Sequence, residues 1–488
     1  MTEPVEGIGK TATRSVGWSM AQNWGGRFFT FALFVVLARL LTPHDFGVVS
    51  AANIVLLFIA MVSDFGFGEA IVQRRNMKHT DVNLPFFFSL FMSLTLAFVV
   101  SMNAEIVSGW LNVEGVEIVL ATICFIAPLT TLSQFQEYNY RKQLRFKALA
   151  FRVFVANIIA GAASIATVLA GFGIWALVVQ MYVTILVSLI WLWSMPVWKP
   201  TFTLDFKAFR ELARFGFSVV TMRVFDFLAQ RFVEFFVIGR YGVAIFGLYA
   251  VGARVYQIMM QLLQGALSDA SLAVLSTIAH NRAKMAELYL KTIVISNFLF
   301  APVFCFVAAL SPEISLILFG AKWEGVEDIM RPLMILGAVQ CSQFMNGPFL
   351  SAMGRPSLVM YVSAIKNLAA PIALLTIPSA GVADVAMIWA FSQFLGTPFS
   401  FGLTARELKV PILRVILNAA PAVLGCVAAD LAVDALRDHL SSSIDSVFLM
   451  GIVLGASYFA VYGMISCSLG YRQVKTIVTF VRNRMNSR

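Results

Sequence analysis

The chain has 488 residues, of which 59% are hydrophobic and 13% charged, and its mean hydropathy is +0.82. A soluble domain carries about 25% charged residues, so the composition excludes a soluble protein. Apolar runs of membrane-spanning length recur from one end of the chain to the other. They are continuous and do not alternate with polar residues, which excludes a β-barrel. We therefore predict an all-α polytopic membrane protein.

We predict fourteen membrane-spanning helices, joined mostly by short connections. In chain order the predicted spans cover residues 16–39, 46–70, 83–104, 117–137, 149–170, 173–194, 215–239, 244–267, 287–309, 328–350, 357–378, 383–403, 412–434 and 446–468. The longest connections lie near 195–214, 268–286 and 310–327.

Lys and Arg residues are distributed unevenly over the predicted loops. With the N-terminus in the cytoplasm, 23 of them fall in cytoplasmic segments. The other side holds five, namely Arg39, Arg240, Lys322, Arg331 and Arg437. Cytoplasmic loops of membrane proteins are enriched in these residues, so we predict that both termini are cytoplasmic. This bias also accounts for the net charge of +10, which therefore requires no nucleic-acid partner.

Two helix junctions, about 200 residues apart, have similar sequences. In one, Arg39 precedes a short turn and Phe46-Gly47; in the other, Arg240 precedes a turn and Phe246-Gly247. Six spans separate the copies, so both have the same orientation. This predicts a parallel repeat about an axis along the membrane normal, with a binding site between the halves. The predicted units are 1–205, 206–411, and 412–488 with two additional helices and a basic tail.

The first span and the turn after it resemble a known family. The motif A-R-L-L-T-P-H-D-F-G covers residues 38–47, and the first span contains Trp18, Ser19, Gln22, Asn23, Trp24, Gly26 and Arg27. With the arrangement of six, six and two spans, these features resemble the Wzx-type polysaccharide exporters of the multidrug/oligosaccharidyl-lipid/polysaccharide exporter superfamily. The resemblance implies two six-helix lobes around a central cavity in the bacterial inner membrane. It also implies flipping of an undecaprenyl-diphosphate-linked oligosaccharide to the periplasmic leaflet.

The seventh predicted span carries charges in an otherwise apolar run. A charge at the bilayer centre costs about 2.5–3.5 kcal/mol on insertion scales. At 100° per residue, one face about 140° wide collects Arg223, Asp226, Gln230, Arg231 and Glu234. Such a face can line a wet cavity. The alternative is structural: Arg223–Asp226 and Arg231–Glu234 are i,i+3 pairs of opposite sign and can neutralise each other.

Other spans also carry polar residues. Gln257, Gln261 and Gln264 follow Arg254 on one face of the eighth span, and Asn23 accompanies Arg27 in the first. Given the resemblance, Arg27 and Arg254, with Arg223 or Arg231, are candidates to bind the lipid diphosphate, because guanidinium groups match phosphate oxygens. Candidates to bind sugar hydroxyls are Asn23, Gln230, Gln257, Gln261, Gln264 and Lys366, and further Gln340, Gln343 and Asn346. Asp64, Asp226 and Glu234 are candidates for ion coupling.

Two other classes of protein fit the sequence less well. A drug or cation exporter of the same superfamily should carry unpaired carboxylates where the first span has Arg27. A polymerase or glycosyltransferase should show a large outer loop with catalytic acids, whereas the longest outer loop here is short. No phosphate-binding G-x-x-x-x-G-K-[ST] loop occurs, so we expect a transporter without cofactor or metal. Membrane lipids, a polysaccharide polymerase and export machinery are expected partners. The sugar, the coupling energy and the oligomeric state stay open.

Overall fold

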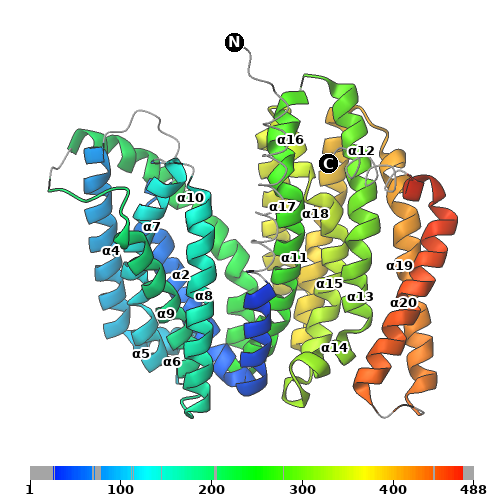
Figure 1. The fold of residues 1–488 in the computed structure, drawn as a ribbon, viewed down its shortest axis with the longest axis horizontal. Helices are drawn as coiled ribbons and strands as arrows, with labels where there is room; N and C mark the ends of the chain where they lie inside the picture. The colour runs from blue at the N-terminus through cyan, green and yellow to red at the C-terminus, as the bar shows by residue number, and fades with distance from the viewer. Residues whose placement is uncertain are drawn as a thin grey trace. The chain divides into compact units, whose positions relative to one another are not determined.

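The computed structural model describes residues 26, 28–68, 71, 79–111, 113, 115–143, 145–202, 206–278, 280–442, 444 and 446–475. These residues form α-helices and two short 3-10 helices, and no strand occurs among them (Figure 1). The helical prediction is therefore confirmed. The chain divides into two compact units, one of Gly25–Ala250 and one that contains Val251–Arg488.

The first unit begins with the apolar helix Phe28–Leu40. It continues with α2 (Pro43–Asp64), η1 (His79–Val82), α4 (Asn83–Met102), α5 (Ala104–Leu111), α6 (Val116–Ile123), α7 (Ile126–Lys142), α8 (Phe146–Leu169), α9 (Trp175–Ser194) and α10 (Phe206–Tyr241). The sequence determines the start of α2 locally. The Thr42 backbone N–H donates to Asp45 at 2.9 Å, the Asp45 N–H donates back to the Thr42 hydroxyl, and Pro43 opens the first turn.

The second unit takes most of α11 (Val243–Ile278) and the helices that follow it. These are α12 (Arg282–Leu299), α13 (Ala301–Ala309), α14 (Ser311–Leu318), η2 (Ala321–Trp323), α15 (Val326–Gln343), α16 (Asn346–Ala352), α17 (Pro356–Thr376), α18 (Val382–Leu408), α19 (Ile412–Leu440) and α20 (Val447–Leu469). The last two pack side by side, at the orange and red end of the colour scale (Figure 1).

In the part of the chain that the structure describes, ten helices are long and apolar enough to cross a membrane. They are Pro43–Asp64, Thr80–Met102, Val116–Lys142, Phe146–Leu169, Trp175–Ser194, Val243–Gln264, Arg282–Ala309, Pro356–Thr376, Ile412–Leu440 and Val447–Leu469. The four other predicted spans coincide in part with the shorter helix Phe28–Leu40 and with α10, α15 and α18. None of the last three helices contains a stretch that is both long enough and apolar enough to count among the ten.

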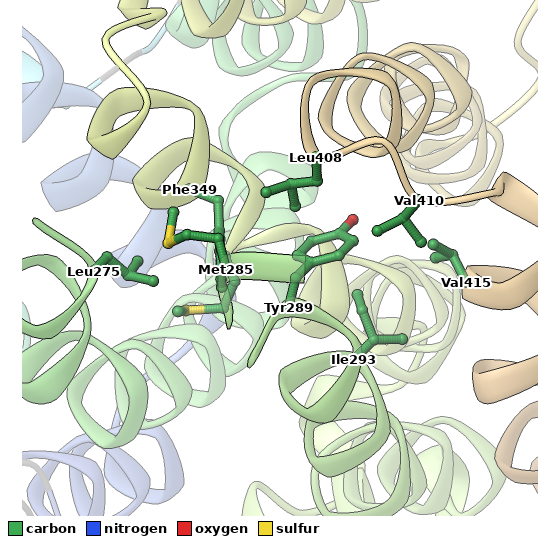
Figure 2. Packing of buried hydrophobic residues seen from close by; sticks show 9 residues of the cluster. Leu275, Met285, Tyr289, Ile293, Phe349, Leu408, Val410 and Val415 are labelled. Atoms are coloured by element: carbon green, nitrogen blue, oxygen red, sulfur yellow. The ribbon is translucent and has the colours of Figure 1, made fainter. Parts of the chain in front are cut away.

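One core cluster of the second unit surrounds Tyr289 of α12 (Figure 2). Its other members are Leu275, Met285, Ile293, Met345, Phe349, Leu408, Val410 and Val415. The Tyr289 hydroxyl donates to Asn346 Oδ1 at 2.9 Å, and Asn346 Nδ2 donates to Ser400 Oγ at 2.8 Å. A polar group buried among apolar side chains must find a partner, and this chain of bonds ties α12, α16 and α18 together.

The two similar junctions of the sequence meet in the first unit. A Cβ added to Gly47 would lie 2.0 Å from the carbonyl oxygen of Val243, and one added to Gly247 would lie 1.8 Å from that of Pro43. The two contacts are equivalent under the 200-residue offset of the repeat: Gly47 corresponds to Gly247, and Pro43 corresponds to Val243. The first turns of α2 and α11 therefore make a reciprocal contact, and only glycine permits so close an approach.

Candidate functional site

The charged residues of α10 find different partners. Arg231 Nη1 donates to Glu234 Oε1 at 2.5 Å within the helix, so this i,i+3 pair is confirmed. The Arg231 guanidinium also lies 5.8 Å from the centroid of the Phe227 ring, within the range of a cation–π contact. Both charges are thus neutralised on α10 itself, and the bilayer cost of the pair is reduced.

Arg223 is paired across helices and not within α10. Its Nη1 donates to Asp64 Oδ2 at 2.8 Å, while the Tyr138 hydroxyl of α7 donates to Asp64 Oδ1 at 2.7 Å. The predicted Arg223–Asp226 pair is wrong: Asp226 is exposed and has no hydrogen bond or ion pair with any described residue. Asp64 is a stronger partner because it is buried at the end of α2, where the carboxylate is poorly solvated.

The polar face of α11 lies opposite its packing face. Gly252 and Val255 are buried, and a Cβ on Gly252 would lie 2.9 Å from Ile329 of α15. Arg254, two residues from Gly252 and so about 200° around the helix, is exposed. It makes no hydrogen bond or ion pair with the described residues. Its guanidinium is therefore available to a ligand.

The glutamines beyond Arg254 continue this face. Gln257 and Gln261 are exposed, and Gln264 is half-buried. On α10 of the first unit, Gln230 is also exposed. At membrane depth, exposed amides such as those of Gln257 and Gln230 need water or a polar ligand. Arg27 and Asn23, the predicted partners from the first span, lie outside the described residues.

Three further residues that we expect to bind sugar hydroxyls already have hydrogen-bond partners inside the second unit. Gln340, which is half-buried, accepts a hydrogen bond at its Oε1 from the Tyr256 hydroxyl at 2.6 Å, and the buried Gln343 accepts one at its Oε1 from Thr397 at 3.4 Å. Asn346 is 1% exposed and bonds Tyr289 and Ser400. Polarity in an apolar run identified these residues but not the direction in which they point.

Lys366 lies at the centre of α17, and its aliphatic stem packs across Gly396 of α18. A Cβ on Gly396 would lie 2.4 Å from Lys366 Cγ, so a larger residue there would displace the lysine. The lysine side chain is half-buried and forms no ion pair with the described acids. Glycine at 396 therefore gives the stem its path and leaves the ammonium group free to reach a polar environment.

A second network of charges, which sequence reasoning missed, joins α13, α14, α15 and α19. Arg437 donates to both oxygens of Glu313 at 2.8 and 3.0 Å, to Asp434 at 2.7 Å and to the Ala309 carbonyl at 2.6 Å. Arg331 Nη2 reaches Asp434 at 3.1 Å and Asp430 at 3.4 Å. The only sequence signal was the i,i+3 spacing of Asp434 and Arg437.

The second unit also contains an apolar cavity of about 570 Å³. It is lined by residues of α12, α13, α15, α18 and α19, and Val415, Ala419, Val423 and Cys426 form a line along one wall. Its polar lining residues are Asn297, Ser342, Thr397 and Asp430. The three-to-four-residue spacing on α19 was visible in the sequence, but it did not reveal that the facing helices leave space.

Comparison with known proteins agrees with this arrangement. The family model described as "Polysaccharide biosynthesis protein" matches residues 36–328. The chain is 24% identical over 459 residues to the Succinoglycan biosynthesis transport protein ExoT of Rhizobium meliloti (strain 1021), across 93% of this chain and 92% of that protein. It is 18% identical over 380 residues to the Lipopolysaccharide biosynthesis protein WzxC of Escherichia coli (strain K12), across 75% of each.

Two solved structures share the fold. The Lipid II flippase MurJ, in an inward closed conformation, superposes with a TM-score of 0.70 at 14% identity, across 93% of this chain and 98% of that one. An inward-facing multidrug resistance MATE family transporter superposes with a TM-score of 0.62 at 15% identity, across 79% of this chain and 94% of that one. These proteins are membrane transporters or flippases. Since the family model matches well over half of its length, the chain belongs to the polysaccharide biosynthesis protein family and is a Wzx-type, multi-pass membrane member of the multidrug/oligosaccharidyl-lipid/polysaccharide exporter superfamily.

Proposed function

We propose that the protein flips an undecaprenyl-diphosphate-linked oligosaccharide repeat unit from the cytoplasmic to the periplasmic leaflet, for synthesis of an exopolysaccharide. The family supports a role in polysaccharide biosynthesis. Similarity along nearly the whole chain to a succinoglycan transport protein supports an exported polysaccharide. The lipid-linked oligosaccharide consists of sugars, a diphosphate and a polyprenyl chain. Each part needs a protein environment of matching polarity.

The observation that carries the proposal is the exposed guanidinium of Arg254, which pairs with none of the described residues and lies on a helix of membrane-spanning length. A cation in this position needs an anion or water, and a diphosphate supplies oxygen acceptors that fit its rigid fork of donors. Gln257, Gln261 and Gln264 follow at one-turn intervals and can exchange hydrogen bonds with sugar hydroxyls. Arg27 and Asn23 of the first span, Gln230, Arg231 and Lys366 are the further proposed contacts.

The apolar cavity of the second unit suits the polyprenyl chain. Lipid tails are as apolar as the protein interior, so a chain that moves from the bilayer into the cavity gains little free energy. Such a cavity guides the chain without trapping it. A transporter needs this property, because its substrate must leave the site again.

We further propose the finer architecture that the resemblance implies. Fourteen helices form two six-helix lobes, 1–205 and 206–411, around a central cavity, and 412–488 adds two helices and a basic tail. Both termini lie in the cytoplasm, at the inner membrane of a bacterium. A polymerase and export machinery act on the flipped product, and the protein itself performs no covalent chemistry. Asp64, Asp226 and Glu234 are the proposed residues for ion coupling.

Proteoliposomes loaded with a lipid-linked repeat unit test this function. We expect Arg254→Ala to reduce flipping at least about tenfold, which corresponds to about 1.4 kcal/mol of lost interaction, and Arg254→Lys to recover part of it. Arg414→Ala, which removes an exposed arginine near the start of α19, is the matched control and should flip normally. Equal flipping by the Arg254 variants and the wild type would refute the site. Drug efflux without lipid flipping would favour the alternative exporter.

A further inference from the structure

Trp389 of α18 lies on the packed face of its helix but is not itself covered completely. At about 100° per residue, Val385, Ser392 and Gly396 lie within about 60° of Trp389 around the helix. All three are buried, whereas Trp389 is only half-buried. Part of the indole is therefore open, although the helix face around it packs against neighbouring helices.

The indole is held in place by residues of α11 and α15. Tyr256 contacts Trp389 edge to face, with the ring centroids 6.0 Å apart and the ring planes at 85°. Tyr256 is buried, and its hydroxyl donates to Gln340 Oε1 at 2.6 Å. A ligand that approaches Trp389 therefore meets a ring whose orientation is already fixed, which reduces the entropy lost on binding.

Polar groups with unused hydrogen-bonding capacity accompany the indole. Neither the Trp389 indole N–H nor the Gln340 amide nitrogen donates to any residue that the structure describes. Gln393, one turn beyond Trp389, donates from Nε2 to the Lys366 carbonyl at 3.3 Å, and its Oε1 accepts from no described residue. The Lys366 stem crosses Gly396, which follows on the same face of α18. Donors and acceptors inside a membrane protein need partners, so this site suits a ligand with several hydroxyl groups.

We propose that Trp389 stacks against a sugar ring of the repeat unit, while Gln340, Gln393 and Lys366 exchange hydrogen bonds with its hydroxyl groups. This inference rests on the proposed function and names the residue that recognises the sugar part of the substrate. A pyranose ring has an apolar face of C–H groups and a rim of hydroxyl groups. An aromatic ring face with donors and acceptors beside it matches both parts. A diphosphate would require more positive charge than Lys366 alone supplies, and a polyprenyl chain would leave the amides without partners.

The apolar cavity of the second unit lies against a different face of α18. Its lining residues on this helix are Thr397, Pro398 and Phe401, which lie about 80–180° around the helix from Trp389. The second unit therefore offers a polar aromatic site and an apolar cavity on separate faces of one helix. Sugar and polyprenyl chain can be bound at the same time, each in surroundings of its own polarity.

Binding of two lipids by the purified full-length protein tests this role of Trp389. One is the undecaprenyl-diphosphate-linked repeat unit extracted from producing cells, and the other is undecaprenyl diphosphate, the same carrier without sugars. We expect the wild type to prefer the first lipid, and Trp389→Leu to reduce this preference about tenfold, because the ring and its N–H are both lost. Trp389→Phe keeps a smaller ring without the donor and should reduce the preference about threefold. The affinity for undecaprenyl diphosphate should change in neither variant.

Trp191→Phe is the matched control. Trp191 of α9 is also half-buried and also contacts another ring, that of Phe151, at 5.4 Å between centroids, so its substitution should leave the preference unchanged. Thermal stability is followed in parallel. A purely structural Trp389 would make both variants lose stability and affinity for both lipids together, and this outcome would overturn the inference.

The remaining outcomes are also decisive. If Trp389→Leu is not recovered as folded protein, Trp389→Phe decides alone: an unchanged preference overturns the inference, and a reduced preference with unchanged stability supports it. A wild type that flips the repeat unit but binds both lipids equally refutes only the sugar site at Trp389. A wild type that does not flip the repeat unit refutes the proposed function.

Discussion

Arg437 of α19 and Arg254 of α11 both lie in helices of membrane-spanning length, but their surroundings are opposite. Arg437 has two carboxylates and a backbone carbonyl as acceptors, and 21% of its side chain is exposed. Arg254 is exposed and has no partner in the described part of the chain. The comparison teaches that a membrane protein handles a guanidinium in two ways. An arginine whose donors are all bound by protein acceptors stabilises the fold, and one whose donors lack protein acceptors is available for a ligand.

Removal of Arg437 should have the largest effect on stability. Arg437→Ala leaves the Glu313 carboxylate, 8% exposed, without its bidentate partner, and loss of one member of a buried pair costs about 3–5 kcal/mol. We expect a lower melting temperature in detergent and less protein in the membrane. The double variant Arg437→Ala/Glu313→Ala should recover part of the loss. If Arg437→Ala alone has wild-type stability, then a full set of protein acceptors does not identify a structural arginine.

The sequence predicted what depends on local order. Apolar runs predicted the helices, and i,i+3 spacing predicted the Arg231–Glu234 pair within α10. The Arg223–Asp64 pair was beyond this reasoning, because 159 residues separate the partners and only the packing of α10 on α2 brings them together. The polar side chains of Gln343 and Asn346 were unusual in an apolar run, but the sequence did not show that they are buried in the core.

The contact between the two repeated junctions also could not be predicted from the sequence. The Phe-Gly pairs at 46–47 and 246–247 predicted two equivalent junctions. The sequence contained no sign that the two glycines meet, each against the carbonyl group at the start of the other helix. The cavity of the second unit was likewise unpredictable, since five helices line it and the space depends on how all their side chains pack.

Substitution of Arg254 by leucine should change stability in the opposite direction. The substitution breaks no ion pair with a residue that the structure describes, and leucine is favourable where arginine costs about 2.5–3.5 kcal/mol at the helix centre. Because the exposed arginine can reach water, we expect only about 1 kcal/mol of this difference to appear as a higher free energy of unfolding. Thermal melting of the purified variant measures it, and flipping should be lost in the same sample. A clear loss of stability would mean that Arg254 has a structural partner and would remove the contrast with Arg437.

Arg231 lies between these two cases, because it has one carboxylate partner and that partner is on its own helix. Its pair with Glu234 is intrahelical, and the side chains are 29% and 18% exposed. Arg231→Ala leaves a half-screened carboxylate, so we expect a loss of about 1 kcal/mol in the free energy of unfolding. The double variant Arg231→Ala/Glu234→Ala removes both charges and should restore stability, with the coupling measured by the double-mutant cycle. The flipping activity of the double variant then separates two roles of Arg231. If flipping and stability are both restored, the pair is structural. If the double variant is stable but does not flip, Arg231 contacts the substrate in addition to neutralising Glu234.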